Sequence, residues 1–186
     1  MDREQSLNHP FFAENLYLLR GIMIEIRETS KDDLKNVQRL WADKEVMAHV
    51  GIPDGIIRSD NQMNSWLEAQ ISKQANSKHY SIYKDGKYCG EVHYNIFTDH
   101  GNIADLGIKL YSFARGLGIA NYALSFVIEK AYKNGAKIIS LDPNPNNKRA
   151  IRFYEKMGFV KKDTPDFVSK RFPQFDHYYM ELNKNS

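Results

Sequence analysis

The stretch from Tyr111 to Ala123, YSFARGLGIANYA, places two glycines beside an arginine at the start of a segment with helical periodicity. A glycine-bearing turn that leads into a helix directs free backbone N–H groups, and the positive end of the helix, at an anion. The chemistry that these residue types and this spacing could perform is therefore the binding of a phosphate group.

The spacing around the turn separates the phosphate-containing cofactors. A dinucleotide-binding turn needs a third glycine where this chain has Asn121. A nucleoside-triphosphate loop needs Gly-Lys-Ser/Thr, whereas Gly118 is followed by Ile119 and Ala120. The remaining pattern, Arg-x-x-Gly-x-Ala from Arg115 to Ala120, suits the pyrophosphate of coenzyme A. A tight turn that binds nothing is the alternative for this stretch alone.

A second motif, LDPNPNNKRAIRFYEKMGF, runs from Leu141 to Phe159. Together the two motifs resemble the GNAT superfamily of acetyl-CoA-dependent N-acetyltransferases, in which the glycine turn is followed by a strand, an Asn-capped helix with Ala and Tyr on one face, and Gly-Phe. The matching positions here are Asn147, Ala150, Tyr154, Gly158 and Phe159. The resemblance covers residues 23–182, so we expect an N-terminal extension over 1–22 and an acetyltransferase domain over 23–186.

The resemblance implies acetyl-CoA as cosubstrate and no metal. It implies that the backbone of the turn binds the pyrophosphate, and that the strand over 103–110 pairs with the pantetheine arm where it splays from the strand over 137–142. The cofactor-binding residues expected on this basis are Ile108, Lys109, Leu110, Arg115, Gly116, Leu117, Gly118, Ile119, Ala120, Asn121, Asn147 and Tyr154.

Acetyl transfer to an amine needs a neutral nitrogen, hydrogen-bond donors for the oxyanion and an acid for the departing thiolate. The resemblance assigns the oxyanion donor to the backbone near Leu110 and the acid to Tyr154. A phenol with a pKa of about 10 can protonate a thiolate with a pKa of about 8.5. Packing in the core is the alternative role for Tyr154.

The general base is open among three carboxylates, each of which could instead be a solvated or ion-paired acid of a strand. Asp142 ends the strand that faces the thioester in the family, and Asp105 lies on the neighbouring strand, near another carboxylate position that the family uses. Glu91, within CGEVHYNI, is the third candidate. His93 and His177 rank below these acids, because histidines at alternate strand positions are usually structural.

The acceptor is the least defined part of the prediction. The second motif is similar to aminoglycoside 6'-N-acetyltransferases, which favours a small cationic primary amine. The segment LWADKEVMAHVGIPDG is similar to ribosomal-protein N-acetyltransferases, which favours a protein N-terminus or lysine. A non-catalytic acyl-CoA-binding protein is the third alternative, and homodimers are common in the family. Trp66, Tyr178 and Tyr179 are candidate walls of the acceptor pocket, with core packing as the alternative for Trp66.

The elements that must position these residues form one α/β sheet. Alternation predicts strands over 23–27, 79–84, 88–97 and 103–110, and short strands over 137–142, 159–163 and 175–182. Helical spacing predicts helices from Ser30, over Ser59 to Gln74, from the glycine turn to about 134, and over 146–156. The fold class predicted is α/β, a single-domain GNAT fold whose central mixed twisted sheet of about six to seven strands is flanked by about four helices.

Composition excludes several other classes of protein. A chain of 186 residues with 42% hydrophobic residues and a net charge of +3 fits one soluble domain. Its basic residues are interspersed with acids, so no nucleic-acid partner is expected. Cys89 is the only cysteine, which excludes a disulfide framework. Without a long apolar run or a signal peptide, we expect a cytoplasmic protein with no membrane partner.

Overall fold

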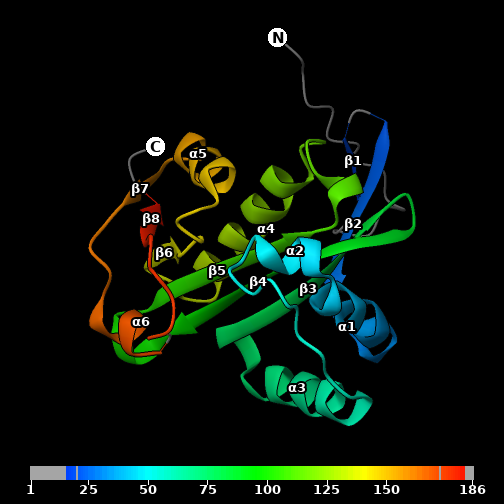
Figure 1. Cartoon of the computed structure of the whole chain (residues 1–186), viewed down its shortest axis with the longest axis horizontal. Coiled ribbons are helices and arrows are strands. Elements are labelled where there is room, and N and C mark those ends of the chain that lie inside the picture. Colours follow the sequence, from blue (N-terminus) through cyan, green and yellow to red (C-terminus); the bar gives the residue numbers. More distant parts are fainter. Residues whose placement is uncertain (1–15, 20, 172, 183–186) are drawn as a thin grey trace.

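The computed structural model describes residues 16–19, 21–171 and 173–182 (Figure 1). They form one eight-stranded sheet in the order β1-β2-β3-β4-β5-β6-β8-β7, in which β5 and β6 are parallel and the other neighbours antiparallel. The strands are β1 (Leu16–Leu19), β2 (Ile22–Glu28), β3 (Ser77–Lys84), β4 (Lys87–Phe97), β5 (Ile103–Leu110), β6 (Ile138–Leu141), β7 (Phe159–Lys161) and β8 (Met180–Leu182). The predicted mixed α/β sheet is confirmed.

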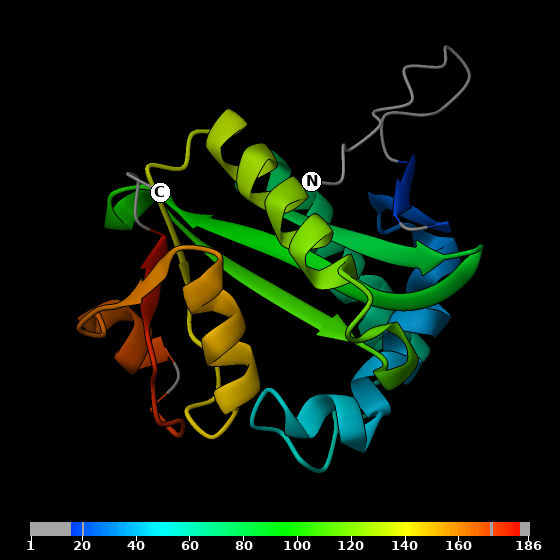
Figure 2. The ribbon, with the colours of Figure 1, turned by 90° about the horizontal axis from the view of Figure 1, so that it is seen from above.

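Six α-helices accompany the sheet in the described residues. They are α1 (Leu34–Ala42), α2 (Lys44–Ala48), α3 (Asp60–Ser72), α4 (Ile119–Lys133), α5 (Lys148–Lys156) and α6 (Asp166–Arg171). In Figure 2, α4 crosses one face of the sheet, while α1 and α3 lie behind the other. No helix among these residues is both long and apolar enough to span a membrane.

The differences from the predicted elements are confined to short segments. The sequence analysis did not predict β1, which pairs with β2 and raises the strand count above the expected six to seven. The short helix α2 was not predicted, α6 occupies a segment expected to be a loop, and the last strand begins at Met180 instead of Phe175. Residues 1–15 of the predicted N-terminal extension lie outside the described residues, so the domain boundary at 22/23 stays a prediction.

The main core lies between α4 and the sheet. The helix buries an apolar stripe that includes Ala123, Leu124 and Val127, which joins strand residues such as Val92 in one cluster. Helical spacing of about 3.6 residues per turn brings these positions onto one face. Cys89 is fully buried in the same cluster, and burial raises the pKa of its thiol to about 12. This thiol is a core side chain.

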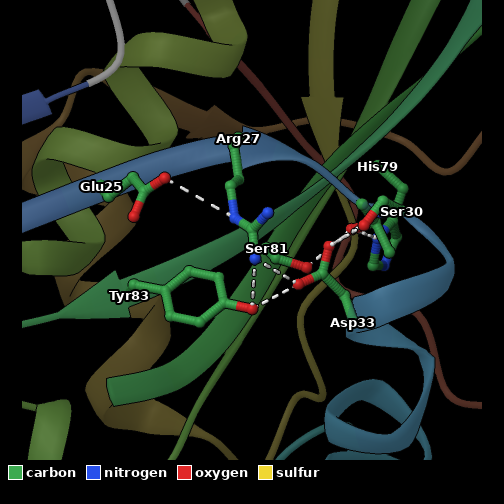
Figure 3. Close-up of polar contacts among 8 residues, drawn as sticks. Glu25, Arg27, Ser30, Asp33, His79, Ser81 and Tyr83 are labelled. Carbon is green, nitrogen blue, oxygen red and sulfur yellow. Dashed lines mark hydrogen bonds and ion pairs between the residues drawn. The ribbon is translucent and has the colours of Figure 1, made fainter. Parts of the chain in front are cut away.

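The opposite face of the sheet carries polar side chains, some of which fix the start of α1 (Figure 3). Asp33 is fully buried, and its Oδ1 accepts a hydrogen bond from Arg27 Nη2 at 2.9 Å and another from the Tyr83 hydroxyl. Its Oδ2 accepts from the backbone N of Ser30 at 2.8 Å and from the Ser30 Oγ at 3.0 Å. One carboxylate therefore joins β2, β3 and the first turn before α1.

This arrangement predicts a large loss of stability in Asp33→Ala. The substitution removes a buried charge partner of Arg27 and the acceptor for Ser30, which should lower the free energy of unfolding by about 3 kcal/mol. The matched control is Asp32→Ala, an exposed neighbour, for which the change should stay within about 0.5 kcal/mol. Urea denaturation measures both, and equal losses would contradict the role of Asp33.

Candidate active site

The pairing between β5 and β6 ends where the candidate site residues begin. Ile103, Ala104 and Asp105 of β5 pair with Ile138, Ile139 and Ser140, but β5 continues to Leu110. On the other side, β6 ends at Leu141 and Pro143 follows, a residue that cannot donate to a ladder. The two strands part as the resemblance implied, leaving the edge of β5 open.

A cavity of about 500 Å³ lies in this opening, and we call it the cofactor cavity. Ten of the twelve predicted cofactor-binding residues line it: Ile108, Lys109, Leu110, Arg115, Gly116, Gly118, Ala120, Asn121, Asn147 and Tyr154. The other two, Leu117 and Ile119, pack into the main core, and Ile119 is fully buried. The side chain of Ile119 is therefore unavailable to a ligand, whereas Leu117 is only partly buried.

The glycine turn needs its glycines because of its backbone conformation. Gly116 and Gly118 have φ angles of +78° and +84°, a region that residues with a side chain rarely adopt. A Cβ on Gly118 would lie 3.0 Å from Leu19 Cδ2 on β1, so it would point at the edge strand. Gly118 is also the N-cap of α4, whose first N–H groups have no partner within the helix.

Two arginines flank this turn. Arg115 Nε donates to the backbone O of Leu110 at 3.0 Å, and its Nη1 lies 3.0 Å from Glu45 Oε1, which ties the turn to β5 and α2. Arg149, which the sequence analysis did not single out, lines the cofactor cavity, with its Nη2 3.9 Å from the place of a Cβ on Gly116. Cationic side chains beside unpaired N–H groups form a binding site for an anion.

The second motif contributes to the same cavity. Asn147 caps α5, since its Oδ1 accepts from Ala150 N at 3.1 Å, while its Nδ2 donates to the His49 backbone O at 3.2 Å. Tyr154 lines the cavity from α5, and burial raises the pKa of its phenol to about 12. The phenol therefore holds its proton throughout the neutral range, although the raised pKa makes it a weaker acid than an exposed tyrosine.

An acidic cavity of about 370 Å³ adjoins the cofactor cavity, with which it shares lining residues such as Val50, Leu106 and Asp142. Three carboxylates line it: Asp105 at the last β5–β6 pair, Asp142 just after β6, and Asp176 before β8. The fold thus brings two of the predicted base candidates together at the point where the strands part.

Asp105 and Asp142 have different environments within the acidic cavity. Asp142 is held by two donors, the backbone N of Tyr178 at 2.7 Å from Oδ1 and Nδ1 of His177 against Oδ2. Burial raises the pKa of Asp105 to about 7, with the charge of Arg171 opposing the shift and that of Asp142 adding to it. Asp105 is therefore the carboxylate that can exchange a proton near neutral pH.

Glu91 does not fit the expected role of a base. It is fully buried, and its oxygens lie 2.6 Å from Lys109 Nζ and 2.9 and 3.0 Å from Trp41 Nε1. Burial alone would raise its pKa, but the charge of Lys109, followed by that of His79, holds the pKa well below its usual range. Glu91 is not among the lining residues of these cavities, so we interpret it as the permanent counter-ion of Lys109.

Within the described residues, Glu91, His79 and His93 form a group that could hold a metal ion. One ligand atom from each residue lies within 4.8 Å of the other two. The oxygens of Glu91 already accept from Lys109 and Trp41. A metal ion would have to displace the ammonium of Lys109 or lie beside it. We therefore assign no metal to this group.

A third cavity, of about 790 Å³, lies against the face of β5 covered by α1 and α3, and we call it the tryptophan cavity. Trp41 of α1 and Trp66 of α3 line it, together with Gly107, Ile108 and Lys109 of β5, which also line the cofactor cavity. Trp66 combines both roles considered for it, since it also packs against the small core under α1. The tyrosines differ: Tyr179 is buried in the core, and neither Tyr178 nor Tyr179 is among the residues lining these cavities.

Comparison with known proteins agrees with this geometry. The fold matches a GNAT-family acetyltransferase from Streptococcus pneumoniae (TM-score 0.69, 22% identity, 86% of this chain and 99% of that one). It matches a spermidine N-acetyltransferase from Vibrio cholerae, in complex with CoA and spermine (TM-score 0.69, 18% identity, 86% of this chain and 94% of that one). It also matches the aminoglycoside acetyltransferase AAC(6')-Ib, in complex with coenzyme A (TM-score 0.67, 18% identity, 87% of this chain and 95% of that one).

These identities are low and show the shared fold. The family model described as the acetyltransferase (GNAT) family, however, matches residues 35–159, which is more than half of the chain and includes both sequence motifs. The chain therefore belongs to the acetyltransferase (GNAT) family.

Proposed function

We propose that this protein transfers an acetyl group from acetyl-CoA to a primary amine. The observation that carries the proposal is the meeting of the glycine turn, the open edge of β5 and Tyr154 in one cavity, with an acidic cavity beside it. The glycine turn, the β5 edge and Tyr154 suit the binding of an acyl-CoA, and the acidic cavity suits the binding of a cation.

The cofactor cavity suits coenzyme A in two places. The unpaired N–H groups at the start of α4, with Arg115 and Arg149 beside them, would hold the pyrophosphate. The open edge of β5 over residues 106–110 would pair with the amides of the pantetheine arm, as a strand added to a sheet does. Backbone N–H near Leu110 would then donate to the developing oxyanion.

In the proposed reaction, the amine nitrogen forms a bond to the acetyl carbon as the carbon–sulfur bond breaks. Asp105 takes the proton from the amine, which its pKa of about 7 allows, and Tyr154 gives its phenolic proton to the departing thiolate. Asp142, with its oxygens held by Tyr178 and His177, stays in place to bind the ammonium form of the acceptor. Glu91 is not part of this proposed set.

We further propose a small cationic amine as acceptor, with aminoglycoside-like amines among the candidates. The carboxylates of the acidic cavity support this choice, and the structural neighbours include an enzyme complex with spermine. The test is release of free thiol from acetyl-CoA across aminoglycosides, polyamines, amino acids and N-terminal peptides. Turnover with peptides alone would favour the protein-acetylating alternative, and no turnover despite CoA binding would refute the enzyme in favour of an acyl-CoA-binding protein.

The first prediction concerns the glycine turn. Gly118→Ala should weaken CoA binding at least tenfold, because a side chain at a φ of +84° strains the turn by about 1–2 kcal/mol and meets Leu19, which moves the N–H groups. Gly135→Ala is the matched control: its φ is +98°, it has open space around it, and it lies at the far end of α4. Calorimetric titration with CoA should show normal affinity for the control. Equal losses of CoA affinity in the two variants would count against pyrophosphate binding at the glycine turn.

The second prediction concerns the pH dependence of the reaction. If Asp105 accepts the proton, kcat/KM should fall as pH drops below about 7, since the carboxyl is then protonated. Asp105→Asn should remove this limb and lower turnover at pH 8 by about 100-fold or more. Asp176→Asn, an exposed acid of the same cavity, should keep the limb.

Stability separates this effect from unfolding. Folding raises the pKa of Asp105 above its unfolded value of about 4, so ionisation of this group opposes folding and its cost is complete above about pH 7. Asp105→Asn should therefore be at least as stable as the parent at pH 8 by thermal denaturation. A pH limb that survives in Asp105→Asn would remove the assignment of the base.

The third prediction concerns the acid. Tyr154→Phe should lower kcat by about 100-fold or more while CoA affinity changes little, since the ring still lines the cavity and only the proton donor is lost. Tyr132→Phe, an exposed tyrosine near the C-terminal end of α4, serves as control. Unchanged turnover in Tyr154→Phe would leave the residue as a packing group.

A further inference from the structure

We propose that the acceptor is an amine with one cationic end and an uncharged, aromatic body, and that this body lies in the tryptophan cavity while the amine lies at Asp105. This inference rests on the proposed acetyl transfer and narrows its substrate class to amines with a single charge, in place of the polycationic aminoglycoside-like amines. Nothing in the two sequence motifs pointed to it, because the cavity is formed by α1, α3 and the loop between α2 and α3.

The tryptophan cavity and the acidic cavity lie along one face of β5. Asp105, Gly107 and Lys109 are opposite Asn95, His93 and Glu91 of β4, and alternate residues of a strand point to the same side. Two residues along a strand cover about 6.8 Å. The His93 ring covers Gly107 on this face, so the route from an amine at Asp105 to the tryptophan cavity passes Val50, which lines both cavities.

The aromatic wall of this cavity is held in place from within the protein. Trp41 Nε1 donates to both oxygens of Glu91, and the ring of Trp66 meets that of Trp41 edge-to-face at 4.9 Å. Trp66 in turn packs edge-to-face on His79 at 4.8 Å. Rings already fixed lose little freedom when a flat apolar group packs on them, which favours binding of an aromatic body.

The charges around the cavity argue against a second ammonium group. Among its described lining residues the charged side chains are Arg58 and Lys109, both cationic, and no carboxylate is present. Glu91 lies behind the wall and is already paired with Lys109. A polycation would gain cation–π contact with the tryptophans, but its second charge would lie near Arg58, and the cavity lining offers no carboxylate to pair with it. The carboxylates are grouped at the other end, in the acidic cavity.

The experiment compares three primary amines as acceptors for the full chain with saturating acetyl-CoA: 2-phenylethylamine, the diamine 1,5-diaminopentane, and ethylamine, which lacks a body. We expect kcat/KM for 2-phenylethylamine to exceed the other two values at least tenfold. In Trp66→Ala, the ratio of KM for 2-phenylethylamine to KM for ethylamine should rise at least tenfold. Trp66→Phe should restore most of the lost selectivity.

A second variant tests how the charge of the cavity lining affects acceptor preference, at an exposed position outside the core. Arg58 is exposed at the cavity, and Arg58→Glu should raise the ratio of kcat/KM for 1,5-diaminopentane to kcat/KM for ethylamine at least fivefold. Preference for the diamine in the parent protein, or variants that shift all three amines equally, would overturn the inference and leave the proposed acetyl transfer standing. Absence of thiol release with every amine would overturn both.

Discussion

The early end of the β5–β6 ladder is the constraint on which the rest of this molecule depends. Three pairs of residues hold the two strands together, and beyond Asp105 the N–H and C=O groups along one edge of β5 have no strand to pair with. Unpaired backbone groups inside a protein are costly unless a ligand or water satisfies them. The prolines after β6 keep that segment from closing the gap, and the glycine turn, α5 and the acidic cavity all border it.

A second constraint is the polar face of the same sheet. Burying Glu91 and Lys109 removes two charges from water, a cost that their mutual attraction offsets only when further hydrogen bonds are present. Trp41 supplies two of these bonds, so the ion pair also orients the ring that walls the tryptophan cavity. The network in Figure 3 acts on the same helix from its other end, because Asp33 fixes the start of α1 and Trp41 lies near its close.

What the sequence could predict was local in the chain. The glycine turn and the Asn147 cap are defined by neighbouring residues, and the strands and longer helices follow from periodicity. The rest depends on contacts between distant segments. Nothing in Leu16–Leu19 shows that Leu19 packs at Gly118, and nothing beside Glu91 shows that Trp41 and Lys109 surround it. Arg149 was missed because one arginine in a basic segment carries no signal until the turn lies next to it.

The same limit explains why the choice of base stayed open among three carboxylates until their surroundings were known. A carboxylate that binds an ammonium must stay charged, whereas a carboxylate that accepts a proton from the amine needs a pKa near neutral pH. One carboxylate therefore cannot serve both purposes well. Donors from the segment before β8 hold Asp142, and the Lys109 ammonium holds Glu91 in its charged form. Burial, with the neighbouring charge of Asp142, raises the pKa of Asp105. Its place at the last β5–β6 pair ties it to the first constraint, because the parting of the strands that opens the cofactor cavity also sets how deeply this carboxyl is buried.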